Sequence, residues 1–172
     1  ACRLTLKVPK DFRAIPGQYV TLGVADKSGI VHRRQYSITH FGSGTLSICV
    51  KGVPGGLVSN VLCDDCNPGD FVTLEGPEGD FILVERQLRD SKNLVFVTGG
   101  SGITPVYAII RAAIEQEYTG KIYLVYGSVS ESEIIFYEAL KSLKTPNCEF
   151  IFAIDEDTPN WAGETGQLTE DK

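Results

Sequence analysis

The first half of the chain consists of short stretches in which apolar and polar residues alternate. Alternation with a period of two places one side-chain face against a core and the other toward solvent, as in half-buried β-strands. The stretches predicted as strands are residues 4–8, 19–24, 31–39, 46–51, 71–75 and 81–84. Turn signals such as Pro16-Gly17 and Pro68-Gly69-Asp70 separate them, and only residues 57–62 have a helical pattern. This pattern predicts a small antiparallel barrel or sandwich.

From residue 94 onward the pattern changes to apolar runs separated by amphipathic stretches. Residues 94–97, 122–126 and 150–154 are runs of the kind found in strands that are buried on both faces. Between them, residues 105–118 and 131–143 carry apolar side chains at the i, i+3 and i+4 spacing of a helix. The order is therefore β-α-β-α-β, which predicts a parallel sheet of three strands with right-handed crossovers.

Both predicted helices carry start signals. Thr104 followed by Pro105 supplies an N-cap hydroxyl and a proline at the first helical position. The sequence from Ser130 to Glu133 has the serine and glutamate spacing of a capping box. We therefore expect the helices to begin at these two points.

The polar residues 85–93 separate the two patterns. We expect one domain over residues 1–88 and a second over residues 94–172. Three parallel strands make a thin sheet, and residues 163–172 lie where a further strand and helix would normally begin. The second domain is therefore expected to be truncated at its C-terminus, with residues 94–97 at an open edge of the sheet.

Composition and charge narrow the class of protein. The chain has 172 residues, with 16 Lys and Arg against 22 Asp and Glu, so its net charge is -6. The basic residues are scattered, which argues against a nucleic-acid partner. Since no apolar run approaches the roughly 20 residues needed to cross a bilayer, no membrane span is expected.

The cysteines bear on compartment and on metal binding. The chain has five of them, Cys2, Cys49, Cys63, Cys66 and Cys148, mostly in apolar runs. An odd number of this kind is typical of buried free thiols in a reducing, cytoplasmic setting. Cys63 and Cys66 have the spacing of half a metal site, but no second cysteine or histidine pair accompanies them, so no metal is expected.

Three segments carry candidate binding chemistry, and the most distinctive is the glycine-rich stretch of residues 98–105. It lies between a predicted buried strand and a helix, where free backbone amides and the positive end of the helix attract phosphate. Pro105 stands where a dinucleotide-binding fingerprint has a third glycine, so a plain tight turn is the alternative.

The other two segments lie in the first half. In residues 55–60 a glycine pair precedes the short helix and Ser59 offers a hydroxyl, which fits a phosphate cradle or an ordinary hairpin loop equally well. In residues 33–39, Arg34 and Tyr36 share one face of the predicted strand. Arginine can bind phosphate and tyrosine can stack on a planar ring, although a solvated basic pair beside a core tyrosine gives the same pattern.

In their order and spacing, these three segments resemble the ferredoxin-NADP reductase superfamily, and the resemblance covers nearly the whole chain. It implies an antiparallel Greek-key β-barrel that binds FAD, followed by an α/β parallel-sheet domain that binds a pyridine nucleotide. In this family a strand with the sequence Arg-x-Tyr-Ser binds FAD. By this resemblance Arg34 holds the pyrophosphate, Tyr36 packs on the isoalloxazine and Ser37 hydrogen-bonds near flavin N5.

The resemblance also implies roles for the glycine-rich segments. The residues expected to wrap the FAD phosphates or otherwise contact FAD are Gly56, Leu57, Val58, Ser59, Val50 and Lys51. The residues expected to line the pyridine nucleotide site are Gly100, Gly102, Thr104, Pro105 and Ser128. Among all of these, Tyr36, Ser37 and Thr104 are expected to contact the reacting groups.

Within the superfamily, Val50-Lys51, residues 55–60 and residues 77–81 look most like the reductase half of flavohemoproteins, which are nitric oxide dioxygenases. A later Cys-Gly-Pro segment and a C-terminal aromatic residue, both family features, are absent. A globin domain would have to precede Ala1. By this resemblance, haem would lie in a domain outside this chain.

The end of the second parallel strand bears on the choice of nucleotide. No arginine or lysine occurs between Ile122 and Leu140, where a 2′-phosphate would need one. Glu131 and Glu133 would repel that phosphate. NADH is therefore expected in preference to NADPH.

Taken as a whole, the resemblance implies an FAD-dependent NAD(P)H oxidoreductase. It would pass electrons from NADH to a haem or iron-sulfur acceptor, in the same native chain or in a separate protein. Two alternatives stay open: the reductase component of a multi-protein oxygenase, and a truncated FAD- or nucleotide-binding module without turnover.

Overall fold

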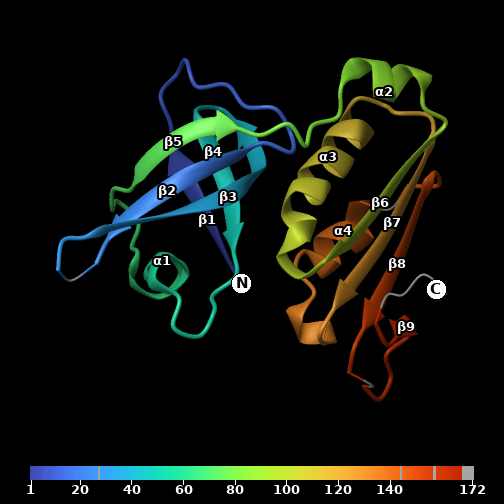
Figure 1. Ribbon diagram of the computed structural model, residues 1–172. Coiled ribbons are helices and arrows are strands. Elements are labelled where there is room, and N and C mark those ends of the chain that lie inside the picture. Colours follow the sequence, from blue (N-terminus) through green and yellow to red (C-terminus); the bar gives the residue numbers. More distant parts are fainter. Residues whose placement is uncertain (27, 144, 157, 168–172) are drawn as a thin grey trace. The chain divides into compact units, whose positions relative to one another are not determined.

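The computed structural model describes residues 1–26, 28–143, 145–156 and 158–167, and the chain divides into two compact units, Ala1–Ile82 and Leu83–Lys172 (Figure 1). The first unit contains an antiparallel sheet and the second a parallel sheet. The fold class expected from the sequence is therefore confirmed.

The sheet of the first unit has five strands in the order β1-β4-β3-β2-β5. They are β1 (Cys2–Lys7), β2 (Tyr19–Ala25), β3 (Val31–Gly42), β4 (Thr45–Val50) and β5 (Thr73–Glu78). Hairpins join β2 to β3 and β3 to β4, while β5 returns along a longer connection to pair with β2. This order is a Greek key.

The long connection between β4 and β5 closes over the core of the first unit. It carries helix α1 (Leu57–Asn60), which continues into a π-helical turn over Val61–Asp65. The expected helix over residues 57–62 is thus confirmed and extended by the turn. Inward-facing residues of the sheet and of this segment form one buried cluster: Val20, Leu22, Val24, Ile38, Leu46, Ile48, Val50, Val58 and Leu62. Burial of this apolar surface holds the segment against the sheet.

A disulfide joins Cys2 in β1 to Cys63 in the π-helical turn, so the expectation of free thiols is wrong for this pair. Cys2 lies opposite Val50 in the pairing of β1 with β4. The Sγ of Cys63 lies 3.6 Å from the backbone oxygen of the same residue. The fold, not the spacing of the cysteines, brings the two sulfurs together. The free thiols are Cys49, Cys66 and Cys148.

Two expected strands near the end of the first unit differ from the structure. The strand expected over residues 71–75 begins later, as β5, and residues 81–84 form no strand. Val84 instead precedes helix α2 (Glu85–Asp90), and its N–H donates to Gln87 Oε1 at 3.1 Å. A run of four apolar residues does not by itself distinguish a strand from the approach to a helix.

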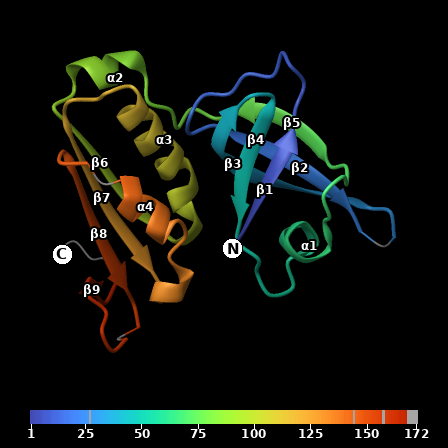
Figure 2. The ribbon, with the colours of Figure 1, turned by 180° about the vertical axis from the view of Figure 1, so that it is seen from behind.

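The sheet of the second unit is parallel, with strand order β6-β7-β8-β9. Its strands are β6 (Asn93–Gly99), β7 (Lys121–Ser128), β8 (Cys148–Ile154) and β9 (Glu164–Thr165). Helices α3 (Ile103–Glu115) and α4 (Tyr137–Leu143) connect the first three strands, and the two views show both helices on one side of the sheet (Figures 1 and 2). The three expected strands are confirmed, and β9 is an additional short strand paired with β8.

The two faces of this sheet differ in burial. Ile122, Leu124 and Tyr126 of β7 are fully buried on the face that the helices cover. On the opposite face, Val95 and Val97 of β6 are 66% and 70% exposed. β6 also lies at the edge of the sheet, as expected.

The helix expected over residues 131–143 is much shorter in the structure. Glu131–Glu133 is a single 3₁₀ turn, and α4 begins only at Tyr137. Phe136, just before α4, has a left-handed φ of +64°, which interrupts any continuous helix.

Packing explains this interruption. The path between the turn and α4 buries both Ile134 and Ile135. It also stacks Phe136 on Tyr107 of α3, with ring centroids 4.2 Å apart. Adjacent residues of a helix point in directions about 100° apart, so one helical face could not satisfy all three side chains. Tertiary contacts therefore outweigh helix propensity here.

Neither expected helix start has the expected cap. α3 begins at Ile103 directly after a 3₁₀ turn over Gly100–Gly102, so Thr104 lies inside the first turn and not at the N-cap. Ser130 precedes the 3₁₀ turn over Glu131–Glu133 without a side-chain cap, and its Oγ lies 3.2 Å from Ser132 Oγ. The expected capping box is therefore not formed.

Among the described residues, no helix has the length and apolar character needed to cross a bilayer. The same residues contain no group of three histidine, cysteine, aspartate or glutamate side chains arranged to hold a metal ion.

Candidate active site

Arg34, Tyr36 and Ser37 lie in the middle of β3, and pairing with β2 sets their positions. Tyr36 lies opposite Val20 and Arg34 lies opposite Leu22, both members of the core. Tyr36 is half-buried and packs against that core, whereas Arg34 is exposed. Burial raises the pKa of the Tyr36 hydroxyl, and the charge of Arg34 opposes this shift. A neutral phenol and a permanent cation thus stand two residues apart on one strand.

The two adjacent arginines of β3 have different surroundings. Arg33 pairs with Glu75 of β5, with Nε 3.3 Å from Oε1. Arg34 Nη1 donates to the backbone oxygen of Arg33 at 2.7 Å, and no carboxylate in the described ranges forms a salt bridge with Arg34. The Arg34 guanidinium therefore keeps donors available for an anion.

The connection after β4 brings a second group of predicted residues to the same core. Val50 and Val58 belong to the core cluster against which Tyr36 packs, and Ser59 is also buried. A Cβ on Gly56 would lie 2.7 Å from Val53 Cγ2 and would also collide with Ser59 Oγ. A side chain here would force Val53 or Ser59 to move, so this tight turn at the start of α1 favours glycine.

The glycine-rich loop of the second unit lies between β6 and α3. Gly100 has a left-handed φ of +52°, and a Cβ on Gly102 would lie 2.7 Å from Thr98 Oγ1. Thr104 is buried, and its hydroxyl donates to Ser101 O at 2.9 Å. Pro105 follows within the first turn of α3, where a missing N–H costs nothing. The loop is thus a tight, glycine-dependent turn at the carboxyl end of a parallel strand.

Ser128 and Tyr126 stand at the carboxyl end of the neighbouring strand. Ser128 is buried at the end of β7, and Gly99 and Gly127 pair across the two strands. The hydroxyl of Tyr126 donates to Gly100 O at 2.9 Å, so this fully buried residue contacts the glycine-rich loop directly. Sequence reasoning missed Tyr126. The only sequence signal for a role of Tyr126 was its position before a glycine near the end of a predicted strand. Such a pattern does not show which group the hydroxyl contacts.

The predicted residues therefore form two groups. In the first unit, Tyr36, Val50 and Val58 pack on one core, whereas Arg34 and Leu57 are exposed. Those after β6 and β7 line the carboxyl edge of the parallel sheet in the second unit. In open parallel sheets this edge is where ligands bind.

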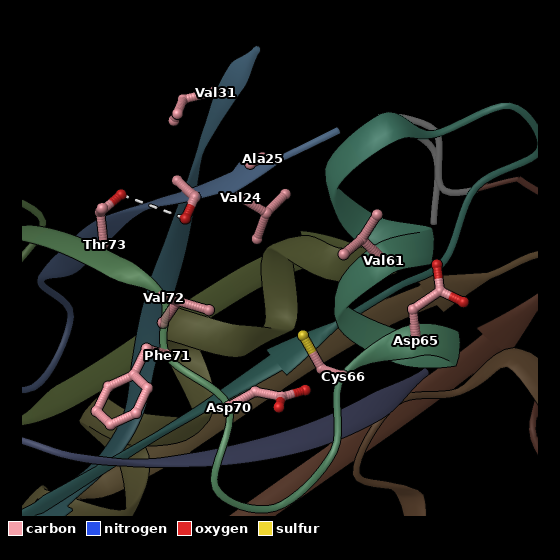
Figure 3. Close-up of a pocket in the computed structure, with 11 residues that line it drawn as sticks. Val24, Ala25, Val31, Val61, Asp65, Cys66, Asp70, Phe71, Val72 and Thr73 are labelled. Atoms are coloured by element: carbon pink, nitrogen blue, oxygen red, sulfur yellow. Dashed lines mark hydrogen bonds between the residues drawn. The ribbon is translucent and has the colours of Figure 1, made fainter. Parts of the chain in front are cut away.

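A separate hollow of about 500 Å³ opens in the first unit where β2 and β5 meet the π-helical turn (Figure 3). Its lining consists of Gly23, Val24, Ala25, Val31, Val61, Asp65, Cys66, Asp70, Phe71, Val72 and Thr73. Figure 3 shows the Cys66 sulfur directed toward the middle of these side chains. Burial, with Asp70 and Asp65 nearby, raises the pKa of the Cys66 thiol, so it stays protonated and weakly nucleophilic. None of the predicted cofactor residues lines this hollow.

Comparison with known proteins gives an independent view of both units. Residues 1–82 match the oxidoreductase FAD-binding domain, and residues 96–172 match the oxidoreductase NAD-binding domain. The chain is 27% identical to the CDP-6-deoxy-L-threo-D-glycero-4-hexulose-3-dehydrase reductase of Yersinia pestis, over 95% of this chain and 48% of that protein. It is 33% identical to a flavohemoprotein of Bacillus cereus, over 76% of this chain and 33% of that protein. The chain thus spans about half or less of these relatives.

Among solved structures, the flavohem-like FAD/NAD binding domain of nitric oxide dioxygenase from Vibrio cholerae superposes with a TM-score of 0.84. The identity is 28%, and the match covers 98% of this chain and 73% of that chain. The Greek-key unit with its Arg-x-Tyr-Ser strand and the parallel unit with its glycine-rich loop agree with these matches in order and in kind. The chain belongs to the ferredoxin-NADP reductase superfamily and comprises an FAD-binding oxidoreductase domain followed by an NAD-binding one.

Proposed function

We propose that the first unit holds FAD through the residues that converge on its core. Arg34 would hold the pyrophosphate with charge-assisted hydrogen bonds, and Tyr36 would offer its ring face to the isoalloxazine. The backbone at Gly56 and the hydroxyl of Ser59 would receive the phosphates. One observation carries this proposal: Tyr36 of β3 and Val58 of α1, from the two segments with candidate FAD-binding chemistry, pack on a single core.

We propose that the second unit holds a pyridine nucleotide at the carboxyl edge of its sheet. Gly100 leaves the backbone open to a phosphate, since nothing lies within 4 Å of the position where a Cβ would stand. Gly102 lets the loop turn tightly against Thr98, and Thr104 holds the loop through its bond to Ser101 O. Ser128 is the buried last residue of the neighbouring strand, β7. NADH is preferred to NADPH in this proposal because the segment after β7 carries acidic side chains and no basic one up to Leu140.

With both groups bound, the flavin would supply the chemistry of hydride transfer from NADH and of one-electron transfer to an acceptor. The protein holds the reacting groups in position, and Ser37 would stabilise the flavin near N5 with a hydrogen bond. We infer that the acceptor is a haem or iron-sulfur centre. The flavohemoprotein of Bacillus cereus supports the first, and the ferredoxin--NAD(+) reductase component of the Xanthobacter autotrophicus alkene monooxygenase system supports the second.

A cytoplasmic setting forms part of the proposal. Three free thiols, at Cys49, Cys66 and Cys148, suit a reducing compartment. The Cys2–Cys63 disulfide argues the other way. Fractionation of the native host cell, with alkylation of free thiols before lysis, would test both points together.

An anaerobic visible spectrum of the FAD-loaded protein, recorded before and after addition of NADH, tests the proposal. Binding should perturb the flavin absorption bands, and NADH should then bleach them. A bound flavin that NADH leaves oxidised would support the alternative of a binding module without turnover. Failure to bind FAD would contradict the assignment of the first unit.

A further inference from the structure

The hydroxyl of Tyr126 joins two segments that follow different strands. It donates to Gly100 O at 2.9 Å and accepts from the N–H of Ile135 at 3.1 Å. Gly100 belongs to the loop after β6, and Ile135 belongs to the connection between β7 and α4. One hydroxyl group thus donates a hydrogen bond to the backbone of one loop and accepts a hydrogen bond from the backbone of the other.

Both partners are backbone groups where regular structure is interrupted. Gly100 has a left-handed φ and begins a 3₁₀ turn. Ile135 lies between the 3₁₀ turn at Glu131–Glu133 and α4, next to Phe136 with its own left-handed φ. Interrupted backbone of this kind depends on side chains for its hydrogen bonds, because an unpaired buried polar group is costly. The Tyr126 hydroxyl supplies such a bond to each segment.

The two segments flank the carboxyl ends of adjacent parallel strands. The loop that contains Gly100 and Gly102 is one wall of the nucleotide site proposed above, and the residues after Ser128 are the other. Tyr126 lies between them with its side chain 0% exposed, so it cannot touch a bound nucleotide itself. Its effect must pass through the backbone that it holds.

We propose that Tyr126 is a positioning residue for the pyridine nucleotide. Its hydroxyl fixes the separation between the glycine-rich loop and the segment after β7 before the nucleotide arrives, which lowers the ordering cost of binding. The inference rests on the proposed function of the second unit, because it concerns the same site. FAD binding in the first unit does not depend on this residue.

Tyr126→Phe removes the hydroxyl and keeps the ring, and Tyr118→Phe is its matched control. Tyr118 is also buried and donates through its hydroxyl to Ser91 O at 2.9 Å. Ser91 lies just before β6 and Tyr118 just before β7, at the amino ends of these strands. Both variants lose a hydroxyl bond to a backbone carbonyl, but only Tyr126→Phe loses it at the nucleotide edge, together with the bond from the Ile135 N–H.

Isothermal titration calorimetry, with NAD+ titrated into the FAD-loaded full chain, measures the Kd of the nucleotide for each variant. We expect the Kd to rise about tenfold or more in Tyr126→Phe, because Gly100 O and the Ile135 N–H both lose their partner, and to stay unchanged in Tyr118→Phe. Under turnover, the KM for NADH should rise more than kcat falls. Equal Kd values in the wild type and in Tyr126→Phe would overturn the inference, as would equal losses in both variants.

Amide hydrogen exchange of the wild-type chain provides a test without substitution. NAD+ should slow exchange at Gly100–Gly102 and at Ile135 together, because one hydroxyl links them. Protection of the glycine-rich loop alone would overturn the coupling. If the wild type binds FAD but not NAD+, the proposed function of the second unit itself fails, and the inference fails with it.

Discussion

Cys2 and Cys63 form a disulfide beside Val50, the last residue of β4: Cys2 pairs with Val50 across the strands, and Cys63 Sγ lies 3.6 Å from Val50 O. The bond ties the first strand to the π-helical turn after α1. Val50 and the neighbouring Lys51 were expected from the sequence to contact FAD. The bond therefore stabilises the backbone at the end of β4, just before the segment that is proposed to bind the FAD phosphates.

Reduction of this disulfide should destabilise the first unit. The bond spans a sequence separation of 61 residues, and a bond that closes a loop of this size stabilises a protein by about 2–4 kcal/mol. Urea unfolding with and without dithiothreitol should show a lower midpoint in the reduced protein, together with weaker FAD retention. The effect of dithiothreitol should persist in Cys66→Ser, which removes a free thiol, and disappear in Cys2→Ser. A midpoint that does not respond to reductant would contradict this role.

Arg34→Ala should weaken FAD binding by about tenfold or more, since it removes a charge-assisted contact to phosphate. Arg33→Ala is the matched control, because that arginine pairs with Glu75 and leaves Arg34 in place. Quenching of flavin fluorescence on titration with protein gives both affinities. Similar losses in the two variants would point to general electrostatics and would contradict a specific role for Arg34.

Ser37→Ala should leave FAD affinity nearly unchanged and slow flavin reduction by NADH, since the proposed hydrogen bond matters most during hydride transfer. Stopped-flow absorbance under anaerobic conditions measures the reduction rate, and we expect a decrease of roughly tenfold or more. Ser47→Ala serves as the control: it removes a hydroxyl that lies 3.1 Å from Thr5 Oγ1 in the same unit. A normal reduction rate in Ser37→Ala would remove this residue from the reacting site.

Val129→Arg should shift nucleotide preference toward NADPH. Val129 follows β7, is 48% exposed and adjoins Ser128, so an arginine there could pair with a 2′-phosphate. The ratio of kcat/KM for NADH to that for NADPH should be well above one in the wild type and should fall in the variant. Ser142→Arg adds the same charge on α4 and should leave the ratio unchanged. A wild-type preference for NADPH would show that the acidic segment does not face the ribose.

The turn between β2 and β3 should respond to acid through Asp26. Its Oδ1 accepts from the hydroxyl and N–H of Ser28 and from Ile30 N, and its Oδ2 lies 2.8 Å from His32 Nε2. These contacts, that of the Ser28 hydroxyl above all, hold the pKa of Asp26 well below its usual value of 3.8. A carboxyl with a lowered pKa in the folded state contributes stability above its usual pKa and loses that contribution as the pH falls further.

Urea midpoints recorded from pH 7 down to pH 2 test this contribution. The wild type should lose stability more steeply below about pH 4 than Asp26→Asn, which lacks the ionisable group. At pH 7 the variant should be the less stable of the two. Asp11→Asn, which alters an exposed carboxylate between β1 and β2, should follow the wild-type curve.

The sequence by itself determined which segments form strands and helices wherever the pattern was regular. Alternation along residues 19–24 predicted β2, because burial on one face leaves a period of two. The apolar run at residues 122–126 predicted β7 as a strand, but the expected burial on both faces is wrong, since full burial alternates along β7. The glycines at positions 56 and 102 stand where the structure leaves no room for a Cβ. The binding roles expected at these positions stay predictions.

Only the tertiary structure decided which distant residues meet. The disulfide between Cys2 and Cys63, the pairing of β9 with β8 and the contact of Tyr126 with Gly100 all join residues that no local pattern relates. The interrupted helix at Phe136 has the same origin, since stacking on Tyr107 outweighs the local preference. A periodic pattern reports whether a side chain is buried, whereas its partner depends on how the whole chain folds back on itself.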